Sequence, residues 1–183
     1  MKSLPPLYPF TIVQNWLKHM DTEAMRHMPL VLDGETKTYK TTAAKTFAVD
    51  PKNYIELNCC NLDHEPNLRS VKPWTEVINF DELKASTFVK NKKVFQGPIG
   101  ACAMGENTAG GSQAYTRRLN GMKMIICSNH FAEDIADLSP ADQKYIWENI
   151  YYLKLKPGEN MFMKAAPSTK ASSSGCALHG DGM

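Results

Sequence analysis

Hydrophobic residues in this chain form short runs separated by polar or helical segments. Five runs rich in branched or aromatic side chains are each long enough for one strand, at residues 28–33, 54–57, 76–80, 124–128 and 151–155. Short apolar runs of this kind are typical of strands. Because helical or loop segments separate them, the pattern predicts an α/β fold with a mainly parallel sheet.

Helical segments are expected between and before these strands. Apolar residues at helical spacing predict an amphipathic helix over residues 10–20, and a second helix is expected over residues 42–48. A third is predicted over residues 139–149, where a serine able to cap the helix is followed by a proline and an acid in the first turn. The first of these helices should pack its apolar face on the core.

These elements divide the chain into three predicted parts. Residues 1–27 form a helical lead-in, and residues 28–156 form the core. Residues 157–183 are expected to be a flexible tail, because serine, glycine and proline replace most groups that could be buried. The chain has 183 residues, 43% of them hydrophobic, which suits one domain with a proper core and leaves little for a second.

Charge and cysteine content indicate a compartment more than a function. The formal net charge is +2, too small to indicate a nucleic-acid partner by electrostatics alone. Five cysteines, including the adjacent Cys59 and Cys60, do not resemble a secreted disulfide framework. No apolar run approaches the roughly 20 residues that span a bilayer. We therefore expect a cytoplasmic or nuclear protein without a membrane partner.

A phosphate-binding loop pattern with one altered position follows the first predicted strand. In the full pattern, GxxxxGK[ST], backbone N–H groups cradle the phosphates, lysine contacts the β- and γ-phosphates, and the hydroxyl ligates Mg²⁺. Gly34, Lys40 and Thr41 match this pattern, and with Thr42 they are expected to bind ATP, Thr41 also holding Mg²⁺. Tyr39 replaces the second glycine, where a Cβ is expected to crowd the phosphates.

Two later strands end in polar residues that extend this pattern. The third predicted strand leads into Asp81 and Glu82, as in a Walker B motif, and the fourth leads into Asn129. The carboxyl ends of parallel strands share one edge, so these residues are expected to meet Lys40. Asp81 would help to hold Mg²⁺, Glu82 would be the catalytic base for water, and Asn129 would sense the γ-phosphate.

The order of these motifs resembles that of the superfamily 3 helicases, especially the ATPase domain of Rep proteins from small circular single-stranded DNA viruses. The resemblance covers roughly residues 7–155. It implies a P-loop NTPase fold, an AAA+-like three-layer sandwich that uses ATP and Mg²⁺. It also implies a homo-oligomeric ring that moves along single-stranded nucleic acid, either DNA or RNA. In that family a basic hairpin contacts the strand, and here Arg117, Arg118 and Lys123 are the residues expected to do so.

Two departures from the family pattern leave other hypotheses open. Tyr39 stands at a glycine position, and no arginine follows Asn129, whereas ring ATPases commonly supply an arginine finger worth about 10³ or more in rate. The first alternative is a decayed Rep-like module that binds nucleic acid or assembles without turning over ATP. A small-molecule kinase is a weaker alternative, because few arginines follow the loop. An ordinary polar loop that caps a helix is the structural alternative.

Overall fold

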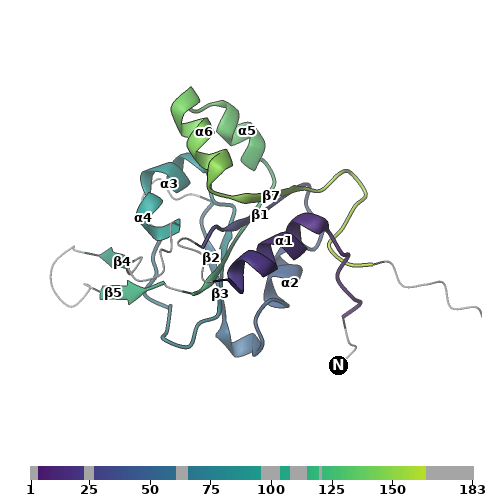
Figure 1. Ribbon diagram of the computed structural model, residues 1–183, viewed down its shortest axis with the longest axis horizontal. Coiled ribbons are helices and arrows are strands. Elements are labelled where there is room, and N and C mark those ends of the chain that lie inside the picture. Colours follow the sequence, from purple (N-terminus) through teal and green to yellow (C-terminus); the bar gives the residue numbers. More distant parts are fainter. Residues whose placement is uncertain are drawn as a thin grey trace, which may run out of the picture.

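Five parallel strands form the central sheet of the molecule (Figure 1). The computed structural model describes residues 4–22, 27–60, 66–95, 104–107, 115–119 and 121–163. In spatial order the strands are β2 (Tyr54–Asn58), β3 (Val77–Asp81), β6 (Lys123–Ser128), β1 (Leu30–Asp33) and β7 (Tyr151–Lys154). All five predicted strands are present, and the prediction of an α/β fold with a mainly parallel sheet is confirmed.

The first strand lies inside the sheet, between two strands that come late in the chain. Leu30 pairs with Ile125 of β6 on one side and with Tyr151 of β7 on the other. The chain leaves β1 for β2 at one edge of the sheet, and later passes from β6 to β7 on the other side of β1. β1 is therefore the switch point of the sheet, where ligands of open α/β sheets bind outside the carboxyl ends of the strands.

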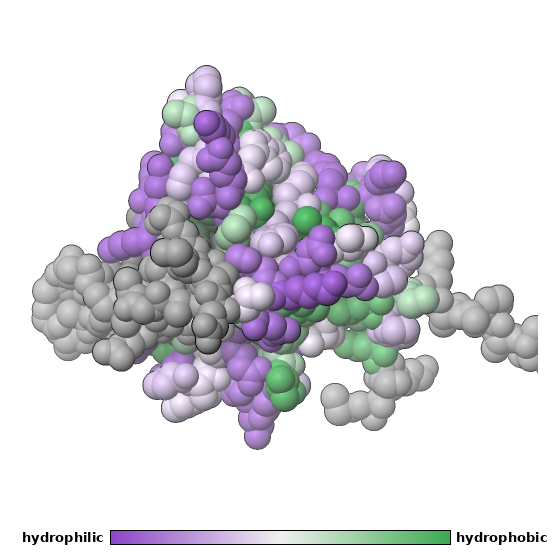
Figure 2. All heavy atoms as spheres, in the orientation of Figure 1, coloured by the Kyte–Doolittle hydropathy of each residue, from purple (hydrophilic) through white to green (hydrophobic). Residues whose placement is uncertain are grey.

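Helices cover both faces of the sheet and make it a three-layer sandwich (Figure 1). One face carries α1 (Thr11–Met20) and α2 (Lys40–Lys45). The other carries α3 (Ala85–Lys90), α4 (Lys92–Phe95), α5 (Phe131–Ala136) and α6 (Pro140–Glu148). The surface over α1 is hydrophilic in Figure 2, while the inner side of this helix buries Val13 and Trp16. Within the described ranges, none of the helices has the length and apolar character needed to cross a membrane.

Side chains of each strand alternate between two hydrophobic clusters, one on each face of the sheet. On β1, Leu30 and Leu32 join the cluster under α1 and α2, whereas Val31 joins the cluster under α3 to α6. Trp16 is fully buried in the first cluster, and its indole Nε1 donates a hydrogen bond to the Met28 carbonyl oxygen at 2.9 Å. Covered faces explain why the strands appear in the sequence as near-continuous apolar runs.

The helix after the phosphate-binding loop differs from its predicted bounds of 42–48. It begins at Lys40 and ends at Lys45. Tyr39 has a left-handed backbone (φ 62°, ψ 26°), and this conformation turns the loop directly into the helix at the next residue. The predicted site lysine is therefore the first residue of α2, with its backbone fixed by the helix.

Several short elements were not predicted as helices or strands. Pro51–Asn53 is a 3₁₀ turn, and α3, α4 and α5 each have six residues or fewer. β4 (Met104–Asn107) pairs antiparallel with β5 (Tyr115–Arg118), apart from the main sheet (Figure 1). This pair falls in the segment where the family resemblance implies a basic hairpin.

The packed structure extends past residue 156, the predicted end of the core. Met161 is 1% exposed and Phe162 is 8% exposed, and both belong to the cluster under α1 and α2. The Met161 N–H donates to the Thr38 carbonyl oxygen at 3.0 Å, and the Tyr8 N–H donates to the Met161 carbonyl oxygen at 2.8 Å. The segment therefore lies between the N-terminal lead-in and the phosphate-binding loop. The rest of the predicted tail, residues 164–183, lies outside the described residues.

A buried carboxylate at the end of β1 joins three elements. Asp33 is 0% exposed. Its oxygens accept hydrogen bonds from the backbone N–H of Phe131 at 3.4 Å and of Ala132 at 3.2 Å, in the first turn of α5. They also accept from the Tyr152 hydroxyl at 2.7 Å and the Lys154 ammonium at 3.4 Å, both on β7. Asp33 thus fixes α5 and β7 to the strand that precedes the loop.

We expect Asp33→Ala to destabilise the protein by about 1–3 kcal/mol, because it leaves donors on α5 and β7, among them the buried Phe131 N–H, without their acceptor. Urea denaturation would measure the loss. Glu133→Ala is the matched control, since Glu133 also accepts from Lys154, at 3.2 Å, but its side chain is 62% exposed. That control should change stability by no more than about 0.5 kcal/mol. Equal unfolding midpoints for the two variants would contradict the role given to Asp33.

Candidate functional site

The loop after β1 and the ends of β3 and β6 meet at one edge of the sheet. The strand register places Asp33 opposite Ser128 and Asp81 opposite Cys127, so the residues that follow these strands emerge side by side. They enclose a hollow of about 310 Å³. Its lining comprises Thr36, Lys37, Thr38, Tyr39, Lys40, Thr41, Thr42, Asp81, Glu82 and Asn129. The sequence motifs predicted this convergence, and the structure brings it about.

The Lys40 side chain is buried inside the loop, with the whole residue 7% exposed. Its Nζ lies 2.6 Å from the carbonyl oxygen of Gly34, 3.0 Å from that of Glu35, 3.3 Å from Thr38 Oγ1 and 3.0 Å from Asn129 Oδ1. Four oxygen atoms thus surround the ammonium group. The lysine holds the loop closed around itself and places a positive charge at the floor of the hollow.

Two side-chain contacts join the other predicted site residues. The Thr41 hydroxyl donates to Asp81 Oδ1 at 3.3 Å, and the Asn129 amide Nδ2 donates to Glu82 Oε1 at 2.7 Å. Because the Asn129 Oδ1 also accepts from Lys40, this single amide bridges the lysine and the glutamate. Asn129, which directly follows β6, therefore contacts both the lysine of the loop and the glutamate that follows β3.

Backbone strain gathers around this hollow. Among the described residues, the non-glycine residues with positive φ are Lys37 (67°), Tyr39 (62°) and Glu82 (56°), and all three line the hollow. A left-handed backbone costs an L-residue about 1–2 kcal/mol. Such residues persist where the surrounding structure holds them, and they cluster at active sites and ligand clamps. The distribution of strain makes this hollow the candidate functional site among the described residues.

Tyr39 fits its position without filling the hollow. Its backbone adopts the left-handed conformation that a glycine would adopt readily, and its side chain is 57% exposed. The ring makes an edge contact with Phe162, with centroids 6.3 Å apart and planes at 79°. The expectation that a Cβ at this position crowds the phosphates stays a prediction. The phenol ring itself contacts Phe162 of the neighbouring segment.

Gly34 is required for a different reason. A Cβ built on it would lie 2.9 Å from the Leu155 Cβ and 3.1 Å from the Leu155 carbonyl oxygen. The Gly34 N–H donates to the Ser128 carbonyl oxygen at 3.2 Å, which places the start of the loop against β6. Close packing against the residue after β7 explains this glycine of the motif. Sequence analysis assigned it to phosphate binding and did not predict the contact with Leu155.

Partial burial shifts the titration of the charged groups in the hollow. Desolvation raises the pKa of Asp81 above its ordinary value. Desolvation and the nearby Asp81 charge raise the pKa of Glu82. Desolvation lowers the pKa of Lys40, although the nearby acids act in the opposite direction. The charges of Asp81, Glu82 and Lys40 are thus less well stabilised than in water, which favours a ligand that supplies compensating charge.

The donor set of the hollow fits a magnesium ion bound together with phosphate. Among the described residues, no group of three or more His, Cys, Asp or Glu side chains is placed to hold a metal. Thr41 and Asp81 offer a hydroxyl and a carboxylate 3.3 Å apart, with Glu82 next in the chain. Mg²⁺ is commonly held by one or two carboxylates, with phosphate oxygens and water completing its shell. The residues present fit that mode.

Asp33 and Thr38 are site residues that the sequence analysis missed. Thr38 Oγ1 accepts from Lys40 and donates to the Glu35 carbonyl oxygen at 2.9 Å, so it closes the loop on itself. Asp33 directly precedes the loop, and its hydrogen bonds to the backbone of α5 fix the position where the loop begins. The sequence signal for Asp33 is an acid directly at the end of an apolar strand, but its partners lie about a hundred residues away.

The basic residues proposed to contact nucleic acid occupy different places. Lys123 begins β6, at the end of the sheet opposite the hollow, and its Nζ lies 3.3 Å from the Phe47 carbonyl oxygen. The Arg117 Nη2 of β5 donates to the Arg69 carbonyl oxygen at 3.1 Å. Arg118 belongs to β5, and its side chain lies outside the described residues. A nucleic-acid role for these three residues stays a prediction.

The raised pKa of Glu82 predicts how stability depends on pH. An acid with a raised folded-state pKa destabilises the fold when ionised, and this cost is absent when the acid is protonated in both folded and unfolded states. Glu82→Gln keeps an acceptor for Asn129 and removes the charge. We therefore expect this variant to be more stable than the wild type at pH 8, with a difference that shrinks as the pH falls toward 4.5, the ordinary value for glutamate.

Urea denaturation at several pH values would measure this effect. Glu133→Gln is the control of opposite sign, because hydrogen bonds, including that from Lys154, lower the pKa of Glu133. That variant should lose stability relative to the wild type at neutral pH and recover as the pH falls. A difference between Glu82→Gln and the wild type that does not change with pH would contradict the prediction.

Comparison with known proteins finds one distant structural likeness to report. No protein-family model matches the chain, and no curated protein matches it. Among solved structures it is similar to the S. cerevisiae Hsp104-ADP complex, with 14% sequence identity and a TM-score of 0.49. The match covers 80% of this chain and 32% of that one, so the chain spans about a third of its length. The parallel sheet and the strand, loop and helix around Lys40 are those of a P-loop NTPase-like fold.

Proposed function

We propose that this chain is a P-loop ATPase of the superfamily 3 helicase type, which hydrolyses ATP to translocate on or unwind single-stranded nucleic acid. The observation that carries the proposal is the Asn129 bridge. One amide contacts the loop lysine at 3.0 Å and the Walker B glutamate at 2.7 Å, beside the hydroxyl and carboxylate pair of Thr41 and Asp81. These residues come from three different strand ends and meet in one hollow.

The binding roles follow from the contacts around Lys40. Its ammonium group exchanges some of its loop contacts for oxygens of the β- and γ-phosphates, while backbone N–H groups of residues 34–42 surround the chain of phosphates. Thr41 and Asp81 would hold Mg²⁺, which neutralises phosphate charge when it is bound. The partially desolvated charges of the hollow gain partners in this arrangement.

The hydrolytic roles fall to Glu82 and Asn129. Glu82 accepts the proton of the attacking water, and its raised pKa brings it closer to neutral pH, where a general base is most effective. Asn129 orients the Glu82 carboxylate through its Nδ2 and detects the γ-phosphate through its contact with Lys40. Loss of the γ-phosphate would change both contacts of this amide, which gives the site a means of reporting hydrolysis.

The proposal includes a single-stranded nucleic acid along which the protein moves and a ring of identical subunits. Arg117 and Arg118 lie on β5 of the antiparallel pair, where basic residues suit contacts to a phosphate backbone. The stretch from Asn129 to residue 183 holds no arginine, and a lysine of this stretch, such as Lys144, would take the place of an arginine finger. We propose that the protein acts as a homo-oligomeric ring in the cytoplasm or nucleus.

A second candidate function is nucleic-acid binding or assembly without ATP turnover. The specific observation in its favour is the left-handed backbone of Lys37 and Tyr39, two residues of the loop itself. An ammonium group that already contacts three oxygen atoms of the loop and the Asn129 Oδ1 has less to gain from phosphate. This candidate predicts a folded protein in which Mg-ATP neither binds nor turns over.

We expect Lys40→Ala to abolish ATP binding, because it removes the buried ammonium group that the motif places against the phosphates. Glu82→Gln should still bind Mg-ATP but hydrolyse it about 10²- to 10⁴-fold more slowly, the usual contribution of a general base. Calorimetry and phosphate release, each with and without single-stranded DNA and RNA, would measure these effects. Lys45→Ala, on the exposed side of the same helix, is the matched control. An unchanged rate in Lys40→Ala would refute the assignment.

Tyr39→Gly distinguishes the two candidate functions. Tyr39 already has the left-handed backbone of a glycine, so an active wild type should have a turnover rate at saturating Mg-ATP similar to that of the variant. Steady-state hydrolysis by both proteins would test this. Turnover that appears only in Tyr39→Gly would favour the second candidate, because the tyrosine would then be what closes the site.

A further inference from the structure

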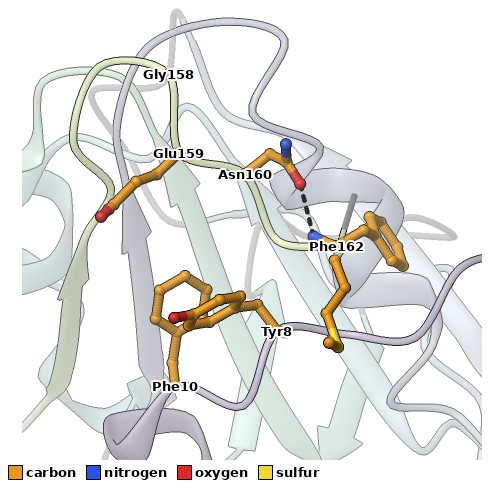
Figure 3. Close-up of a pocket in the computed structure, with 7 residues that line it drawn as sticks. Tyr8, Phe10, Gly158, Glu159, Asn160 and Phe162 are labelled. Atoms are coloured by element: carbon orange, nitrogen blue, oxygen red, sulfur yellow. Dashed lines mark hydrogen bonds between the residues drawn. The ribbon is translucent and has the colours of Figure 1, made fainter. Parts of the chain in front are cut away.

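A second hollow, of about 410 Å³, lies between the N-terminal lead-in and the segment after β7. Tyr8 and Phe10 line one side, and Asn160 and Phe162 line the other (Figure 3). Met163 also lines the hollow. The rings of Tyr8 and Phe10 lie against each other, with centroids 4.7 Å apart. Tyr8 is 52% exposed and Met163 is 45% exposed. Flat aromatic surface is therefore left open to solvent in a concave part of the molecule.

The aromatic hollow and the phosphate-loop hollow share a wall. Tyr39 lines the phosphate-loop hollow, Phe162 lines the aromatic hollow, and their rings touch edge to face. One residue earlier on each segment, the Met161 N–H donates to the Thr38 carbonyl oxygen at 3.0 Å. A ligand that occupies both hollows has to pass Tyr39, the residue that replaces the second glycine of the motif.

The aromatic hollow is pre-formed by backbone contacts. The Tyr8 N–H donates to the Met161 carbonyl oxygen at 2.8 Å, and the Met163 N–H donates to the Pro6 carbonyl oxygen at 2.9 Å. The Phe162 N–H donates to Asn160 Oδ1 at 2.9 Å, as Figure 3 shows. These bonds hold the two sides at a fixed separation, which lowers the entropic cost of ordering them around a ligand.

The chemistry of the two hollows differs in the way that the two ends of a nucleotide differ. The phosphate-loop hollow has hydroxyl groups, a lysine and a pair of acids. The aromatic hollow has aromatic faces, a thioether and the carboxylate of Glu159. That carboxylate disfavours a phosphate and suits a neutral group with N–H donors. A nucleobase offers both a flat face for stacking and such donors.

We propose that the aromatic hollow binds the base of the nucleotide whose phosphates the loop binds, and that Tyr39 is a ligand-binding residue at the junction of the two hollows. This inference rests on the proposed function, because it requires that the loop bind phosphates. Tyr39 then supplies an aromatic surface that a glycine cannot supply. Tyr8 and Phe10 supply the stacking surface for the base.

The test compares Mg-ATP with Mg-tripolyphosphate, which has the phosphates but no base, by calorimetry. We expect the wild type to bind ATP more tightly than tripolyphosphate. Tyr8→Ala should weaken ATP about tenfold or more, as expected for a lost base–aromatic stack, and leave tripolyphosphate unchanged. Tyr39→Ala should weaken ATP more than it weakens tripolyphosphate. Tyr8→Phe and Tyr39→Phe should retain ATP affinity, since they keep the rings. Trp74→Ala, which removes a 63% exposed aromatic residue outside both hollows, is the matched control.

The outcomes separate the base subsite from the nucleotide function itself. Equal affinities of the wild type for ATP and tripolyphosphate, or an ATP affinity that Tyr8→Ala does not change, would overturn the base subsite and leave phosphate binding by Lys40 intact. Failure of the folded wild type to bind either ligand would overturn both proposals. Thermal unfolding of each variant establishes that it is folded. A parallel loss of ATP and tripolyphosphate affinity in Tyr8→Ala would show a damaged loop and also overturn the subsite.

Discussion

Burial of the Asp33 carboxylate is the constraint on which the edge of the sheet depends. A charge without solvent is costly unless it is hydrogen-bonded, and here the backbone of α5, a tyrosine hydroxyl and a lysine of β7 provide the bonds. The next residue is Gly34, which packs on Leu155, and α5 begins two residues after Asn129. One carboxylate thus sets the starting point of the loop and the position of the amide that bridges Lys40 and Glu82.

Rigid support of this kind explains how the loop tolerates strain. Lys37, Tyr39 and Glu82 each hold a left-handed backbone, at a cost of about 1–2 kcal/mol per residue. Their neighbours are fixed by α2, by the contacts of Lys40 and by β3, so the strained residues cannot relax independently. At Tyr39 the edge contact with Phe162 offsets part of the cost. The segment around Phe162, which packs beside the loop, therefore helps to stabilise Tyr39 at the position of the second motif glycine.

Much of the fold and part of the site could be predicted from local patterns. Five apolar runs predicted the five strands of the main sheet. The short motifs predicted that four residues meet at one edge of this sheet, namely Lys40, Thr41, Asp81 and Asn129. The segment around Met161 and Phe162 could not be predicted, because two apolar residues among polar ones give no periodicity and their burial depends on the distant Tyr8. Helix α5 has six residues, too few for a pattern, and its cap comes from Asp33. Such long-range partners leave no local signal.

The charges of the hollow indicate how its ligands should depend on one another. Burial raises the pKa of Asp81 and Glu82 and lowers that of Lys40, so the protein alone does not fully stabilise the charge of any of these groups. A polyphosphate alone would satisfy Lys40 and repel the two acids, whereas a divalent cation alone would satisfy the acids and repel Lys40. Bound together, the two ligands satisfy all three groups. Phosphate and metal should therefore bind this hollow cooperatively, because each removes the repulsion that opposes the other.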